Sequence, residues 1–152
     1  MENDVSIVVN RTDLIENLLD QVVESYCAPR KEVTYFFRHV VLNSSIMPLG
    51  SKIKVAMAIS QELGVKLKQD SLHKVVSYRN SFAHHGLGSH SIMYCHKDPS
   101  QDEVHNHLFI IKNSGKTEMV RRQDALDEFN KNYEIAKQSL VELRDAIKTS
   151  NP

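Results

Sequence analysis

Apolar residues recur every three or four positions along most of the chain, which is the spacing of helices that bury one face. The final stretch follows this spacing for longest, with alternating steps of three and four that are typical of a helix packed lengthwise in a bundle or across a dimer. Its apolar positions are Leu126, Phe129, Tyr133, Ala136, Leu140, Leu143 and Ile147. The pattern as a whole predicts helices over residues 12–28, 30–43, 51–63, 68–85 and 123–149.

Capping residues set the expected ends of these helices. Thr12 is a side chain that can cap a helix start, so the first helix is expected to begin there or one residue later. The apolar run at residues 5–9 is then either an arm or an early helical turn. Gly50 or Ser51 is expected to cap the third helix, and Gly64 to end it.

The period changes between residues 86 and 122. Short strands are predicted over residues 91–96, 105–112 and 117–121, and the Asn113-Ser114-Gly115 sequence signals a hairpin turn. These strands predict a small antiparallel sheet at residues 91–121. The expected fold is therefore mainly α, an up-and-down helical bundle with a small antiparallel β-sheet before the last helix. The 152 residues are enough for a single domain.

Composition narrows the classes of function. The chain holds 19 Lys and Arg against 19 Asp and Glu, so its formal net charge is zero, which argues against a strongly basic nucleic-acid binder. A local patch remains at Arg121 and Arg122, with Lys112 and Lys116 nearby. We predict that Arg121 and Arg122 contact an RNA backbone, and the alternative is a solvated hairpin end.

The cysteines and the N-terminal sequence indicate the cellular compartment that we expect. Cys27 and Cys95 are far apart and form no CxxC pair, which is typical of reduced thiols in the cytoplasm. The N-terminus shows no basic region followed by an apolar run, and no stretch approaches the roughly 20 apolar residues of a membrane span. We expect a cytoplasmic protein that does not enter a membrane.

The candidate chemistry lies at the end of the helix predicted over residues 68–85. Arg79 falls within an apolar stripe, where a charged group needs partners. Asn80 and His84 are four residues apart, so their side chains can touch, and Gly86 offers a C-terminal cap. A guanidinium, an amide and an imidazole at a helix end suit a phosphate or another anion. The structural alternative is that Arg79 bonds carbonyls or a carboxylate and that His84 caps its own helix.

Other polar side chains lie near this motif. His73 and Ser77 share its flank, and we predict that they bind substrate together with His85, although solvated surface positions are the simpler interpretation for the flank. His105 and His107 are two residues apart in a predicted strand, so they share one face and, with Cys95 or His96, are candidate zinc ligands. The spacing matches no established metal signature, so we predict no metal and no cofactor.

The segment Arg79-Asn80-Ser81-Phe82-Ala83-His84 resembles the R-polar-x-x-x-H motif of the HEPN superfamily. With the earlier segment Pro48-Leu49-Gly50-Ser51-Lys52-Ile53-Lys54, it looks similar to the mannitol-operon-repressor (MltR-like) branch. The resemblance covers roughly residues 12–86. It implies a dimerising helical bundle, and catalytic members of the superfamily cleave RNA without metal where two motifs face each other.

Carried over to this chain, the resemblance implies that Arg79 binds the scissile phosphate, that His84 is the general acid–base and that Asn80 orients His84 or contacts phosphate. The leading expectation is a metal-independent endoribonuclease in a toxin or defence setting, acting as a homodimer and leaving 2′,3′-cyclic phosphate and 5′-hydroxyl ends. The alternative is a non-catalytic MltR-like regulatory module that binds protein or nucleic acid. A third interpretation is a toxin held inactive by a neutralising protein partner, or a plain interaction domain.

Overall fold

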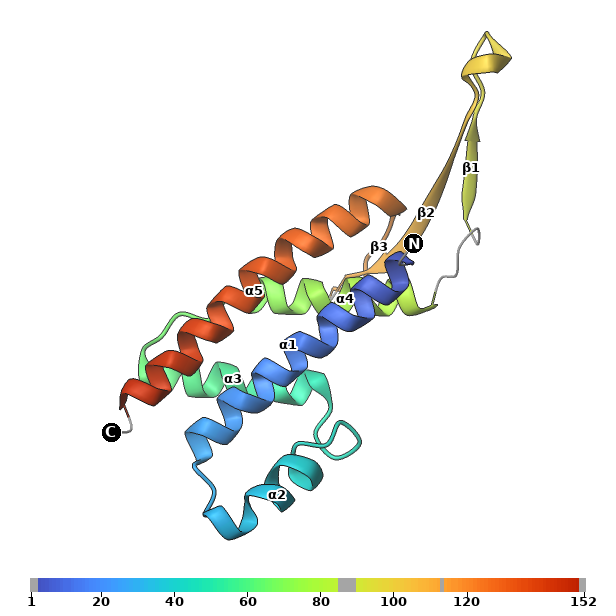
Figure 1. Ribbon diagram of the computed structural model, residues 1–152. Coiled ribbons are helices and arrows are strands. Elements are labelled where there is room, and N and C mark those ends of the chain that lie inside the picture. Colours follow the sequence, from blue (N-terminus) through green and yellow to red (C-terminus); the bar gives the residue numbers. More distant parts are fainter. Residues whose placement is uncertain (1–2, 85–89, 113, 151–152) are drawn as a thin grey trace. The chain divides into compact units, whose positions relative to one another are not determined.

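The computed structural model describes residues 3–84, 90–112 and 114–150 (Figure 1). The chain is mainly helical, with a three-stranded antiparallel sheet before the last helix, so the predicted fold class is confirmed. The α-helices are α1 (Asp4–Cys27), α2 (Thr34–Phe36), α3 (Leu49–Leu63), α4 (Gln69–His84) and α5 (Arg122–Ser150), and the strands are β1 (Ser91–Tyr94), β2 (Glu103–Ile111) and β3 (Thr117–Arg121). No helix within the described ranges has the length and apolar character needed to cross a membrane.

The chain divides into two compact units. The first, which we call the sheet unit, comprises Met1–Thr12 and His73–Asn132. The second, the helical unit, comprises Asp13–Leu72 and Tyr133–Pro152. Helices α1, α4 and α5 each contribute residues to both units, whereas the three strands belong to the sheet unit alone.

Helix α1 begins at Asp4, so the predicted start at residue 12 is wrong. The side-chain oxygen of Asn3 accepts a hydrogen bond from the Val5 amide at 3.2 Å, the contact of an N-terminal cap. Val8 is fully buried, which gives the early turns a packed face. Thr12 lies inside the helix, where its hydroxyl donates to the Val8 carbonyl at 2.8 Å. A side chain typical of caps is thus satisfied within the helix.

The continuous helix predicted over residues 30–43 is also wrong. The segment is a 3-10 turn (Lys31–Val33), the single turn of α2, and a π turn (Phe37–Val41). None of these turns buries a residue, and Phe36 is 59% exposed. Helices in proteins take most of their stability from a face that packs against other elements. The apolar residues of this segment have no such packing, so they do not stabilise one continuous α-helix.

Helix α3 begins at Leu49, and Gly50 and Ser51 therefore lie in its first turn instead of capping it. Its end agrees with prediction, because Gly64 adopts φ 65°, a left-handed conformation that ends helices and favours glycine. Helix α4 runs to His84, and the predicted cap Gly86 lies outside the described residues.

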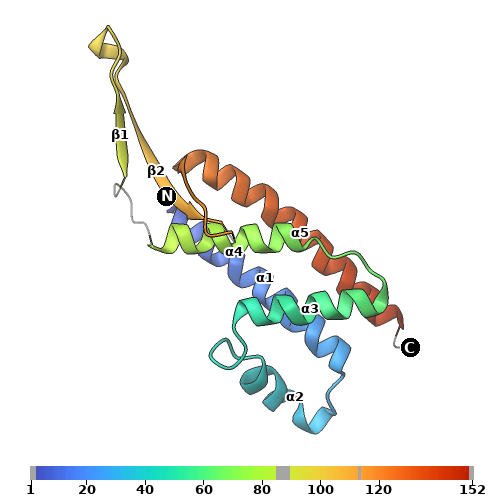
Figure 2. The ribbon, with the colours of Figure 1, turned by 180° about the vertical axis from the view of Figure 1, so that it is seen from behind.

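In the sheet, β2 is the central strand and pairs with β1 along its first half and with β3 along its second. The β1–β2 ladder extends beyond the helical segments of the sheet unit (Figure 2). Leu108 and Ile110 lie on one side of β2 and are buried. Because successive residues point to opposite sides of a strand, the alternate positions of β2 form a second face.

Candidate functional site

Arg79 lies near the end of α4 in the sheet unit and is half-buried. Its Nη1 donates to the side-chain oxygen of Asn80 at 3.3 Å. Within the part of the chain that the structure describes, Arg79 forms no ion pair with a carboxylate. Its positive charge is therefore held by a neutral amide and is available to an anion.

His84 is the last residue of α4 and is exposed. Asn80 is exposed as well, and among the described side chains no hydrogen bond joins Asn80 to His84. All three predicted residues belong to the last turns of α4.

The residues predicted to flank the motif differ in how far the fold engages them. The Ser77 hydroxyl donates to the Ile111 carbonyl at 3.1 Å and so ties α4 to the end of β2. The Ser77 carbonyl in turn accepts a hydrogen bond from Ser81 at 3.1 Å. His73 is half-buried on the same helix, and His85 lies outside the described residues. Ser77 is thus engaged in the fold of the sheet unit.

The two adjacent arginines where β3 ends and α5 begins differ in burial and in their partners. Arg122 is 6% exposed, its Nη2 lies 3.0 Å from the Asp4 carboxylate, its Nε bonds the same group, and its guanidinium lies 5.0 Å from the Phe82 ring centre. The Arg122 guanidinium holds the pKa of Asp4 below its usual value. Arg121 is exposed, with its guanidinium 5.5 Å from the Tyr94 ring centre. Arg122 therefore stabilises the unit, and Arg121 alone faces solvent.

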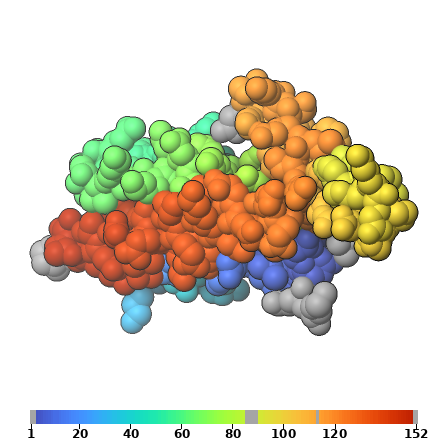
Figure 3. Space-filling model, turned by 90° about the horizontal axis from the view of Figure 1, so that it is seen from above, coloured from blue at the N-terminus to red at the C-terminus, as the bar shows by residue number. Residues whose placement is uncertain are grey.

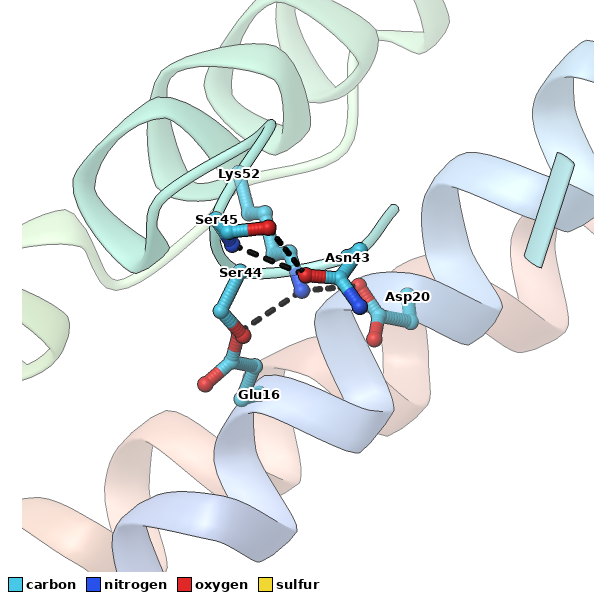
Figure 4. Close-up of polar contacts among 6 residues, drawn as sticks. All are labelled: Glu16, Asp20, Asn43, Ser44, Ser45 and Lys52. Atoms are coloured by element: carbon cyan, nitrogen blue, oxygen red, sulfur yellow. Dashed lines mark hydrogen bonds and ion pairs between the residues drawn. The ribbon is translucent and has the colours of Figure 1, made fainter. Parts of the chain in front are cut away.

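The helical unit holds a buried cation that the sequence reasoning missed (Figure 4). Lys52 of α3 is 1% exposed, and its Nζ lies 2.7 Å from a Glu16 carboxylate oxygen and 2.8 Å from one of Asp20. The Ser44 hydroxyl donates to the same Glu16 oxygen at 2.6 Å, which ties the turn before α3 to α1. Burial raises the pKa of Asp20 although Lys52 is close.

The sequence did contain a signal for this cluster. Lys52 stands four residues before Ala56 and seven before Ile59, both buried, so it lies on the inner stripe of α3. Glu16 and Asp20 are four residues apart and so share one face of α1. A lysine neutralised by two carboxylates is suited to holding elements together, and its amine is not free for chemistry.

Metal ligands do not assemble in the described ranges. No group of three or more His, Cys, Asp or Glu side chains there could hold an ion. His105 instead lies 2.8 Å from Glu103, and the Nδ1 of His107 lies 3.0 Å from the His105 carbonyl oxygen. Cys27 and Cys95 are exposed free thiols.

Comparison of the chain with family models, with curated proteins and with solved structures found no match.

Proposed function

We propose that this protein is a metal-independent endoribonuclease of the HEPN type, with its site at the end of α4. The observation that carries the proposal is the state of Arg79. A guanidinium is costly to leave without a counter-charge in a partly buried position, yet Arg79 is held by the neutral Asn80 amide alone among the described residues. A phosphate would supply the missing negative charge, and arginine binds phosphate in a two-pronged geometry.

The three side chains have complementary roles in phosphodiester cleavage. Arg79 would bind the scissile phosphate and stabilise the charge that develops on it. His84 is exposed and so can reach a ribose 2′-hydroxyl as base or the leaving 5′-oxygen as acid. Attack of the 2′-oxygen on phosphorus forms the 2′,3′-cyclic phosphate and releases a 5′-hydroxyl, and no metal or oxidant is needed.

A homodimer follows from the same chemistry. One motif offers one imidazole, whereas in-line cleavage uses a base on one side of the phosphorus and an acid on the other. Two copies of His84 that meet across a two-fold axis would supply both. Light scattering at micromolar concentration is expected to give twice the mass of the chain, and a monomer would exclude the composite site.

Cleavage of labelled RNA in EDTA tests the proposal. Wild type is expected to cut single-stranded RNA, and His84→Ala to be slower by about 100- to 10,000-fold, the usual contribution of a general acid–base. His39→Ala is the matched control, because His39 is also an exposed histidine but belongs to the helical unit. If wild type, His84→Ala and His39→Ala cut at the same rate, the nuclease proposal is wrong.

A second candidate is a non-catalytic regulatory module that binds a protein. The observation that favours it is the apolar stripe of Val33, Phe36 and Val40, which are 38%, 59% and 41% exposed. This candidate predicts no RNA cleavage by wild type. It also predicts a stoichiometric partner whose binding is lost in Phe36→Ser and kept in His84→Ala.

A further inference from the structure

The segment between α1 and α3 leaves apolar side chains uncovered in the helical unit. None of its three short helical turns buries a residue. The large apolar side chains that it exposes, by 38% to 77%, are Val33, Tyr35, Phe36, Val40 and Ile46. In the space-filling view, light blue atoms of this segment project at the lower edge (Figure 3). Three of these residues, Val33, Phe36 and Val40, follow one another at helical spacing, and we call them the apolar ridge.

The side of the segment that meets α1 is already satisfied. Glu24 of α1 accepts hydrogen bonds from the Nε and Nη2 of Arg38 at 2.9 and 2.6 Å. The Ser44 hydroxyl donates to Glu16 at 2.6 Å, and Leu42 is buried. These contacts hold the segment to the helical unit and leave the apolar ridge on its uncovered side.

Charge beside the apolar ridge favours an acidic partner. Arg30 and Lys31 are exposed directly before the ridge, and neither forms an ion pair in the described ranges. Residues 33–61 contain no Asp or Glu, so Glu32 is the one carboxylate of the segment. The ridge therefore combines apolar anchors with an excess of positive charge, and complementary charge on a partner gives specificity.

We propose that the apolar ridge binds an acidic amphipathic helix of a partner protein. The proposal rests on the protein-binding part of the second candidate function and names the chemistry of the partner. Apolar anchors at helical spacing match the apolar stripe of a helix that packs lengthwise on them. Carboxylates beside that stripe would pair with Arg30 and Lys31. An interface of three anchors is small, so we expect micromolar affinity.

Two other occupants suit these charges less well. A second copy of the chain would bring the apolar ridge against itself, because a two-fold interface is self-complementary, and Arg30 and Lys31 would then meet like charges. Anionic membrane surfaces are recognised by clusters of about four or more Lys and Arg. The ridge has Arg30 and Lys31 next to the acidic Glu32.

Fluorescence anisotropy with labelled synthetic peptides tests the surface. The acidic probe is a peptide of about 18 residues with Leu on one helical face and Glu on the other, and the basic probe has Lys in place of Glu. Wild type is expected to bind the acidic probe about tenfold or more tightly than the basic one. Phe36→Ser should weaken acidic-probe binding by about tenfold or more, the loss of an aromatic anchor. The double variant Arg30→Glu, Lys31→Glu should reverse the preference, which misfolding would not do.

The controls change matched side chains elsewhere in the helical unit. Ile135→Ser removes an exposed apolar side chain of α5, and the double variant Lys66→Glu, Lys68→Glu reverses two exposed charges. Both are expected to bind the acidic probe as wild type does. Far-ultraviolet circular dichroism and a thermal scan check that each variant folds.

Several results would overturn the proposal. Failure of wild type to bind the acidic probe, equal affinity for the two probes, or equal binding by Phe36→Ser and Ile135→Ser would each do so. Light scattering that shows a dimer of wild type and a monomer of Phe36→Ser would give the apolar ridge to a second copy. Sedimentation with phosphatidylserine vesicles that requires Phe36 would give it to a membrane surface.

The outcomes for this surface and for the proposed functions are separable. A natural partner that Phe36→Ser fails to bind, combined with no preference between the probes, would retain the second candidate and reject the acidic helix. Selective binding of the acidic probe that requires Phe36, combined with RNA cleavage that requires His84, would retain the surface and the nuclease and reject the non-catalytic assignment.

Discussion

Two cations on apolar helix stripes, one in each unit, show opposite solutions to the same problem. Lys52 in the helical unit is 1% exposed and lies within 2.8 Å of two carboxylates. Arg79 in the sheet unit is half-buried and bonds a neutral amide at 3.3 Å. The more deeply buried charge is thus the one whose counter-charges are built in.

This difference distinguishes cations whose charge is neutralised within the fold from cations whose charge remains accessible to a ligand, which position on a helix stripe does not do. Removing one partner of a buried ion pair lowers the free energy of unfolding strongly. A buried cation that is already paired with carboxylates has no charge available to a ligand. A cation that keeps solvent access and lacks a carboxylate can accept a ligand anion. Arg122, paired with Asp4, belongs with Lys52, and Arg121, which lies on a tyrosine ring, belongs with Arg79.

The largest effect is expected for Lys52→Met. Removing the lysine leaves Glu16 and Asp20 close together without their counter-charge, so we expect a loss of about 3 kcal/mol in the free energy of unfolding. Urea titration measures it. Lys54→Met is the control, because Lys54 is exposed on the same helix and should change stability by no more than about 0.5 kcal/mol. Equal losses in the two variants would contradict the assigned role of Lys52.

The Asp4–Arg122 pair should give a smaller and pH-dependent effect. Asp4→Asn removes the carboxylate that Asp4 presents to the buried Arg122, and we expect a loss of about 2 kcal/mol at pH 7. The folded pKa of Asp4 lies below the unfolded value of 3.8, so its contribution is present above that pH and is lost as pH falls through the folded pKa.

Urea midpoints of wild type and Asp4→Asn should therefore converge as the pH is lowered from 6 toward 3. Asp124→Asn, an exposed acid in the first turn of α5, controls for general acid effects. A gap between wild type and Asp4→Asn that stays constant over this range would show that the pair does not carry the pH dependence.

The smallest effect on stability is expected for Arg79→Gln. Its partner is an exposed amide, so the free energy of unfolding should fall by less than about 1 kcal/mol, while RNA cleavage is lost. Urea titration and the cleavage assay are run on the same preparation. A stability loss as large as that of Lys52→Met would place Arg79 among the structural cations and remove the main support for the catalytic proposal.

The regular helices and the sheet were predictable because their signals are local. Gly64 ends α3 as expected, and six of the seven predicted seam positions of α5 are buried, with Leu126 the half-buried exception. The errors fell where packing overrides local preference. Thr12 looks like a cap but bonds within α1, and Phe36 continues a helical pattern that no packed face supports.

For the candidate site, the residue types and spacing of Arg79, Asn80 and His84 were evident in the sequence, and so was the choice between a structural and a functional arginine. Only the tertiary structure decided which cations have carboxylates beside them. In the folded chain, Lys52 lies beside Glu16 and Asp20, and Arg122 lies beside Asp4. The Arg121 guanidinium lies over the Tyr94 ring. The reason is physical: periodicity is a property of neighbours along the chain, whereas the partner of a charge comes from a distant segment that folding brings close.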